Sequence, residues 1–336
     1  MDNPTRNQHF ISQAEQRNNC IDKSRPKNRQ RIYKFEIADR ENRVVRLTNK
    51  EGVRIEKNLS FDDLFSFDVS SNVKIPKLRK NFEDFFQKFE TDLVSATHLL
   101  ISESKVNSGS DVMKDTAERV FKAKLMGGIR NPYLIALTIH IFREWVGMHP
   151  TDPVLLAHFS DIRAGTKPHL DKVCAEFGVT REQYFQWLEI LFLALMTPPG
   201  ATKSMLESIV EMLVESKGKM SHLILATFDD IPGCRVALPD TGYLQGTNDP
   251  NLTRLIYNLN RNAFAIFDMV DLSNQTIVNI PPQMRGKVGS YNIKFSTQHH
   301  HNDMSLLEFF NSLAAYQAHS HIFCADPQIF GITTIS

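Results

Sequence analysis

The sequence lacks the motifs that identify several large classes of enzyme. It contains no G-x-x-x-x-G-K-[ST] loop for nucleotide phosphates, no G-x-G-x-x-G turn after a strand, no H-E-x-x-H and no G-x-S-x-G. Pro239-Asp240 supplies the first half of a restriction-type nuclease pattern, but no acidic-x-Lys triplet follows it. These absences argue against ATP-driven work, hydride transfer and the common hydrolase mechanisms.

Paired cysteines and long apolar runs are also missing. The four cysteines are far apart and form no C-x-x-C pair, which argues against a zinc knuckle and predicts reduced thiols. The longest apolar runs, 133–142 and 187–196, are shorter than the ~20 residues that a membrane span requires. The opening MDNPTRNQH has no apolar region, so we expect no signal peptide, no membrane partner and a cytoplasmic location.

The chain has the composition of a folded protein with an unevenly charged start. Its 336 residues are 42% hydrophobic and 23% charged, which predicts a real core in one large or two ordinary domains. Residues 1–31 carry seven Lys and Arg against three Asp and Glu, a net charge of +4 in a chain whose total is +1. The stretch KSRPKNRQR, 23–31, fits a solvated connector or a contact with a phosphate backbone.

The first third predicts β structure and then a change to helical periodicity. Runs rich in β-branched and aromatic residues at 32–37 and 43–48 flank a polar turn, which indicates a hairpin, and 53–69 adds an extended segment. From Pro76 onward, large apolar residues recur every three or four positions, and we assign this stripe to the core. Its members are Phe82, Phe85, Phe86, Phe89 and Leu93.

The middle third predicts an all-helical bundle. Ser110 or Asp111 can cap a helix over about 112–125, which we expect to end at the helix-breaking pair Gly127-Gly128. Thr180 and Gln183 match a capping box. Further helices are expected at 129–148, where the run is apolar enough to be buried, and at 167–178, 180–196 and 201–218.

The last third predicts a mostly antiparallel sheet with one late helix. Strands are expected at 221–228, 234–239, 254–259, 263–270 and 291–295, a helix at 303–320 and a final strand at 321–326. The fold class is therefore α+β. We expect three segments, 1–75, 76–218 and 219–336, in one composite domain, with the N-terminal hairpin joining the C-terminal sheet because two strands alone are marginal in water.

Three polar groups of residues could carry chemistry, and the first lies near the N-terminus. A histidine with a pKa near neutrality could act as acid, base or phosphate ligand, while glutamine and arginine could orient an anionic group. Phe10 and Ile11 indicate that the segment is tethered; the alternative is a histidine that only closes hydrogen bonds where the segment docks. The polar members are Gln8, His9, Gln13, Glu15 and Arg17.

The other two groups are QHHHND, 298–303, and LPDTGY, 238–243. His299 and His301 could share one face of a strand, but the spacing matches no known metal motif, so we predict a solvated loop and no metal site. Asn302 or Asp303 would then cap the following helix. Asp240 ends a strand next to a Gly turn, which suits a catalytic position or a plain turn.

Several short stretches resemble a bacterial domain-of-unknown-function family whose members begin His-His-Tyr-x-Pro-Gln. They are NQHFISQAEQR, RIYKFEI, IRNPY, LPDTGY and LIYNLNRNAFAIF. Gln8 stands at the first His and Ser12 at the Pro, while LPDTGY replaces an Asp-Asn-Pro turn, so His9, Gln13 and Asp240 are the positions that carry over. The resemblance implies a bacterial accessory or effector protein of a mobile defence or toxin module.

These observations support two main hypotheses. In the first, an effector cleaves phosphodiesters: His9 is the acid or base, and Asp240 orients His9 or binds a metal. Gln13 together with Arg17 or Arg130 holds phosphate, and Gln8 contacts the substrate. In the second, a non-catalytic module binds nucleic acid or an acidic protein partner. A third possibility is a sensor of a phage component within a defence complex. No cofactor follows from the sequence.

Overall fold

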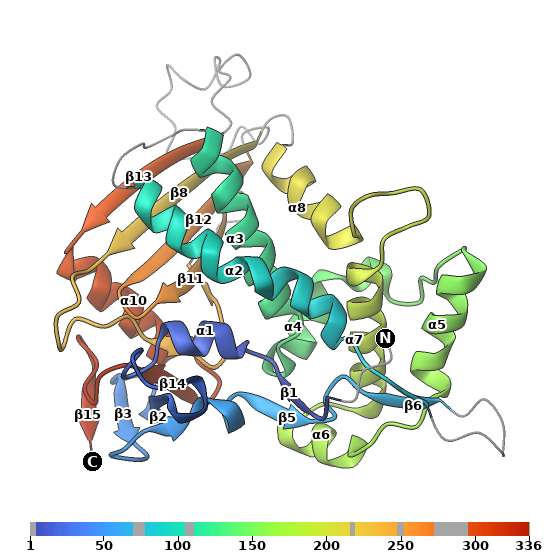
Figure 1. Ribbon diagram of the computed structural model, residues 1–336, viewed down its shortest axis with the longest axis horizontal. Coiled ribbons are helices and arrows are strands. Elements are labelled where there is room, and N and C mark those ends of the chain that lie inside the picture. The colour runs from blue at the N-terminus through green and yellow to red at the C-terminus, as the bar shows by residue number, and fades with distance from the viewer. Residues whose placement is uncertain are drawn as a thin grey trace.

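The computed structural model describes residues 5–69, 78–104, 111–215, 219–246, 252–271 and 295–335 (Figure 1). The predicted α+β class is confirmed: short strands come first, helices fill the middle, and a sheet with a late helix follows. Within these ranges, none of the helices combines the length and the apolar composition that a bilayer span needs.

A five-stranded sheet forms the centre of the C-terminal part. Its order is β10-β11-β12-β8-β13, and every pairing is antiparallel except that of β13 with β8. The strands are β8 (Lys219–Thr227), β10 (Leu244–Gln245), β11 (Leu252–Asn260), β12 (Ala263–Asp271) and β13 (Phe295–His301). The prediction of a mostly antiparallel sheet is confirmed.

Helices cover both faces of this sheet. The helical pair α2 (Glu83–Ser104) and α3 (Asp111–Ile129) packs on the face that carries Leu223 and Leu225, so these two helices belong to the sheet as much as to a bundle (Figure 1). The late helix α10 (Met304–Gln317) packs on the opposite face, where the rings of Phe264 and Phe310 stack 4.5 Å apart. Four of the five residues in the apolar stripe of 82–93 are buried, as predicted.

A second sheet joins the two ends of the chain, in the order β15-β3-β2-β14-β9. The predicted N-terminal hairpin is present as β2 (Arg31–Asp39) and β3 (Val44–Leu47), and β2 pairs with β14 (His321–Cys324). The other members are β9 (Leu238–Pro239), β15 (Thr333–Ile335) and β4 (Val53–Arg54), which pairs with β2 beside the main order. Phe35 and Ile322 of this sheet share a core with α10, which therefore lies between the two sheets.

The remaining helices cluster around α7 (Arg181–Leu195), which is buried along most of its length. The predicted capping box of Thr180 and Gln183 is present, and the indole of Trp187 donates to the carbonyl of Ile129 at 2.7 Å. The helices around it are α4 (Ile135–Ile141), α5 (Pro153–Ala164), α6 (Leu170–Phe177) and α8 (Met205–Glu215).

Three expectations about element boundaries are wrong. The segment 129–148 is not one buried helix: α4 ends at Ile141, and Ile141 and Met148 are exposed. An apolar run without a period does not indicate where its helix turns away from the core. Of the expected strand 234–239 only Leu238–Pro239 forms. Ser110 and the expected strand residues 291–294 lie outside the described ranges.

The third error concerns Gly127-Gly128, which does not end α3. The helix continues to Ile129. The side of Gly128 is covered by Tyr243, whose ring would lie 3.0 Å from an added Cβ atom. The missing side chain therefore permits close approach of the helix to the Tyr243 ring. Nothing lies within 4 Å of the corresponding position at Gly127.

This pair gives a matched test of helix packing. We expect Gly128→Ala to destabilise the protein by about 1–2 kcal/mol through overpacking against Tyr243. We expect Gly127→Ala to stabilise it by about 0.5–1 kcal/mol, because alanine is the better helix former and meets no neighbour. Urea unfolding of both variants measures the difference, and equal effects would contradict the described contact.

Candidate functional site

The N-terminal segment is docked in the fold rather than free, as Phe10 and Ile11 predict. Strand β1 (Asn7–His9) pairs with β5 (Ser60–Asp62), and α1 (Gln13–Asn18) begins at Ser12, whose hydroxyl accepts from the amide of Glu15 at 3.1 Å. Phe10 and Ile11 are buried, 4% and 2% exposed. The candidate residues of this segment are thus held by both β pairing and a capped helix.

Gln8 uses its side-chain amide within the fold. Its Oε1 accepts from the amide of Phe65 at 2.6 Å, and its Nε2 donates to the hydroxyl of Ser66 at 3.0 Å. The side chain is completely buried. The predicted contact of Gln8 with a substrate stays a prediction, and it would require these bonds to break.

His9 lies beside Arg130 in a polar cluster, although the two residues are far apart in the sequence. The Nε2 atom of His9 is 3.4 Å from the carbonyl of Ile55, and burial lowers the pKa of His9 to about 4, with the nearby Arg130 charge acting in the same direction. His9 is therefore neutral at pH 7. Asp240 is not among the charged groups that act most on it, which are Arg130, Glu90 and Arg17.

Arg130 is held by three different partners. Its Nε donates to the carbonyl of Phe10 at 3.2 Å, and its Nη1 is 2.5 Å from the carboxylate of Glu90. Its guanidinium carbon lies 4.9 Å from the ring centre of Phe86. With 3% of its surface exposed, Arg130 docks the N-terminal segment on α2, and the structure thereby joins two of the predicted site residues, His9 and Arg130.

Glu83 is the member of this cluster that sequence reasoning missed. Burial raises the pKa of Glu83 to about 7, although the nearby Arg130 charge acts in the opposite direction. Its Oε1 atom has no hydrogen-bond partner in the described part of the chain. The signal was present in the sequence, because Glu83 and Glu90 are seven positions apart and so lie near one face of a helix.

Arg17 and Gln13 form a pair on one side of α1. The guanidinium of Arg17 donates to Oε1 of Gln13, four residues earlier in the helix. Burial lowers the pKa of Arg17, and the Glu56 carboxylate opposes that shift. The predicted phosphate-binding roles of Gln13 and Arg17 stay predictions, since the pair already satisfies part of its own hydrogen bonding.

Asp240 holds the turn between α10 and β14. Its carboxylate accepts from the backbone amides of three successive residues, His319 at 2.6 Å, Ser320 at 2.8 Å and His321 at 2.8 Å. Its own carbonyl accepts from the side chain of Asn131 at 2.8 Å. With 1% of its surface exposed, Asp240 has the contacts of a structural carboxylate, and its catalytic role stays a prediction.

The polar segment 23–31 lies on the surface beside a second cationic stretch. Register pairs Arg31 of β2 with Arg54 of β4 (Val53–Arg54), so the chain around 50–57 returns next to 23–31. We call the exposed cations of these two stretches the basic N-terminal surface. They are Lys23, Arg25, Lys27, Arg29, Lys50, Arg54 and Lys57.

A cleft of about 370 Å³ opens at the edge of this surface, lined by Ile21, Asp22, Arg25, Arg31, Tyr33 and Glu51. Arg25 pairs with Asp22 at 3.3 Å in an exposed ion pair, which contributes little to stability, so Arg25 can exchange its partner for an incoming anion. Arg31 is 27% exposed, lies 3.4 Å from Glu51 and also donates to the carbonyl of Gly52 at 2.9 Å. The cleft thus combines an aromatic ring with two guanidinium groups and two carboxylates.

The stretch 298–303 is not the solvated loop that the sequence predicts. Residues up to His301 form β13, because the parallel pairing with β8 satisfies their backbone. Asp303 caps α10 as expected, accepting from the amides of Ser305 at 3.1 Å and Leu306 at 3.3 Å. Among the described residues, no three His, Cys, Asp or Glu side chains gather closely enough to hold a metal ion together.

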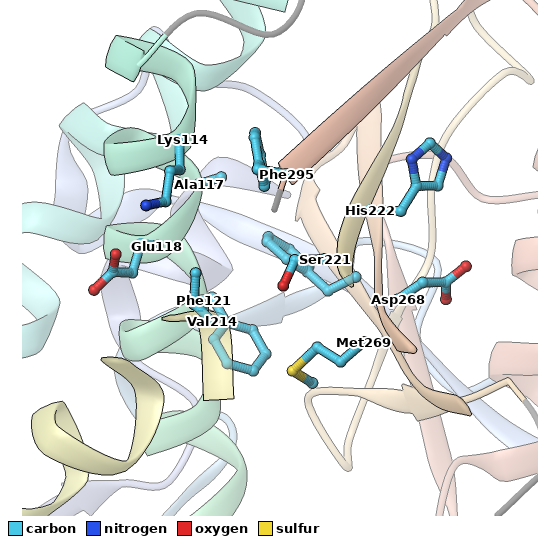
Figure 2. A pocket seen from close by; sticks show the side chains of 11 residues that line it. Lys114, Ala117, Glu118, Phe121, Val214, Ser221, His222, Asp268, Met269 and Phe295 are labelled. Carbon is cyan, nitrogen blue, oxygen red and sulfur yellow. The ribbon is translucent and has the colours of Figure 1, made fainter. Parts of the chain in front are cut away.

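A small cavity between α3, α8 and the five-stranded sheet does not suit a substrate. Phe121, Val214 and Met269 line it, and the hydroxyl of Ser221 is buried without a hydrogen-bond partner among the described residues (Figure 2). Its volume of about 20 Å³ holds roughly one water molecule, which could satisfy that hydroxyl.

The His9 cluster gives a pH-dependent stability that can be measured. The pKa of His9 is about 6.5 in the unfolded chain and about 4 in the fold. Between these pH values the unfolded state binds more protons, so the free energy of unfolding decreases as the pH is lowered. Relative to His9→Gln, we expect the wild type to lose about 3 kcal/mol between pH 7 and 4.

Urea unfolding at four pH values checks this expectation. Glu83→Gln tests the opposite shift: because its folded pKa is raised, the wild type should lose stability relative to this variant as the pH rises from 4.5 to 7. Parallel curves for the wild type and His9→Gln would show that His9 is not buried as described.

Comparison of the chain with models of protein families, with curated proteins and with solved structures finds no match. The resemblance to a bacterial family of unknown function therefore stays a prediction. A functional assignment must be argued from the residues of this chain alone.

Proposed function

We propose that the protein binds nucleic acid through the basic N-terminal surface, as a non-catalytic module of a bacterial defence or toxin system. The observation that carries the proposal is the pairing of β2 with β4, which brings the cations of 23–31 and 50–57 together on one exposed region. The bacterial setting comes from the resemblance of the opening segment and is part of the proposal.

Electrostatics favours a phosphate backbone as the partner of this surface. Lys27 and Arg29 are exposed and have no acidic partner in an ion pair among the described residues, and each can replace a counterion on a phosphate. This mode of binding needs no buried catalytic group. It also needs no sequence recognition, because phosphate contacts position a protein without reading bases.

The adjacent cleft favours single strands over duplexes. Tyr33, Arg25 and Arg31 line the same cleft, so an unpaired base could stack on the Tyr33 ring while the guanidinium groups contact the flanking phosphates. A base inside a duplex is already stacked and would have to be flipped out at a cost of a few kcal/mol. The proposed ligand is therefore single-stranded DNA or RNA.

The contacts of His9 and Asp240 support binding rather than phosphodiester cleavage by these residues. His9 is 8% exposed and has a pKa of about 4, so it is a weak base at pH 7. The carboxylate of Asp240 is already occupied by three backbone amides. An acidic protein partner would contact the same cations but would not use the cleft. The following experiment distinguishes such a partner from a nucleic acid.

Fluorescence anisotropy with a labelled 20-nucleotide single strand tests the proposal. The double variant Lys27→Glu/Arg29→Glu should weaken binding at least about tenfold and reduce the slope of log affinity against log salt by about 1–2. Arg143→Glu is the control, because Arg143 is exposed on η4 (Arg143–Trp145), a different part of the chain.

The proposal fails if the wild type does not bind the strand, or if the double variant and the control bind equally. A duplex of the same sequence should bind more weakly than the single strand. Equal affinity for duplex, single strand and polyglutamate would indicate a general acidic ligand instead of nucleic acid.

A further inference from the structure

Two histidines at the end of β13 point toward one hydroxyl group. His299 and His301 are two residues apart, so they lie on the same face of the strand. The Nε2 of His299 is 2.8 Å, and the Nδ1 of His301 3.2 Å, from Oγ1 of Thr227 on β8. Their ring centres are 6.4 Å apart. Two imidazole nitrogens thus converge on one point at the edge of the sheet.

Two side chains flank Nε2 of His301. Oδ1 of Asp229 is 3.4 Å and Nδ2 of Asn302 3.3 Å from it, so with a proton on Nε2 the Asp229 carboxylate accepts and Nδ1 keeps its lone pair toward Thr227. Asp229 is held in turn by Asn302, whose Nδ2 donates to Oδ2 at 2.7 Å. A carboxylate on the outer nitrogen of a histidine is the usual support of a metal-binding imidazole.

We propose that His299 and His301 bind a divalent first-row transition-metal ion such as Zn²⁺, Ni²⁺ or Cu²⁺. Imidazole nitrogen suits these ions, whereas Mg²⁺ and Ca²⁺ prefer oxygen ligands. A small rotation of the two rings away from Thr227 lets their nitrogens close on one ion. Only two protein ligands take part, in keeping with the absence of a three-ligand group among the described residues.

The remaining coordination positions face solvent. The side chain of His301 is 49% exposed, so water or the oxygen of an anionic ligand can complete the coordination of the ion. The ion would also hold β13, which among the described strands pairs with β8 alone, against the end of that strand. This site is independent of the proposed nucleic-acid surface and can fail or succeed without it.

His300 provides a matched control within the same tripeptide. It lies on the opposite face of β13, where its Nδ1 is 3.5 Å from Asp303. Any general affinity of neighbouring histidines for metal would be reduced equally by replacing His300 or His301. A real site would be lost with His299 or His301 and kept with His300.

The experiment is isothermal titration of the untagged full chain with Zn²⁺, Ni²⁺ and Cu²⁺ at pH 7.5. We expect one ion per chain, with binding at least about tenfold weaker in His299→Gln and in His301→Gln and unchanged in His300→Gln. Asp229→Asn should weaken binding about tenfold through the lost support of His301. The electron paramagnetic resonance spectrum of the Cu²⁺ form should show coupling to imidazole nitrogens.

Folding of each variant is checked by circular dichroism, and Mg²⁺ serves as a negative control. The proposal is overturned if no ion binds stoichiometrically, or if His300→Gln weakens binding as much as His301→Gln. It is also overturned if the Cu²⁺ spectrum shows oxygen ligands alone.

Discussion

A buried ion pair anchors the start of the chain. Lys124 of α3 contacts Glu15 of α1, and their side chains are only 2% and 9% exposed. Removing one partner of such a pair leaves an uncompensated buried charge, which typically costs 3–5 kcal/mol. Nearby, the amides of Asn19 and Asn258 exchange hydrogen bonds at 2.9 Å, linking α1 to β11. The fixed position of α1 between helix and sheet determines where the chain emerges at the surface.

Polar residues on the two sides of α1 have different roles in the first sixty positions of the chain. Before residue 20 the polar side chains are mostly buried and fasten the segment, as Gln8 and His9 illustrate. After residue 22 they are mostly exposed and cationic, as around Lys27. Opposite pKa shifts at His9 and Glu83 fit this view, because burial disfavours the charged form of both groups. The cluster around His9 and Glu83 therefore docks the N-terminal segment and makes the stability of the protein depend on pH.

Much of the fold could be predicted from the sequence because its signals are local. The capping box at Thr180 and the β-branched and aromatic composition of β11 and β12 need no knowledge of distant residues. The sequence is uninformative where a distant partner decides: parallel pairing with β8 makes the histidine stretch a strand, and the approach of the Tyr243 ring to Gly128 has no local signal. At the candidate site, the backbone amides that occupy Asp240 and the burial of Glu83 depend on tertiary packing, which one sequence does not reveal.

The most direct test of this account is to locate the bound strand. A single strand containing 5-bromouracil can be photocrosslinked to the protein, and the crosslinked peptides identified by mass spectrometry. The account predicts crosslinks within residues 21–57, with Tyr33 of the cleft among them. Crosslinks confined to peptides around His9 or Asp240 would contradict it and return the cleavage hypothesis to first place.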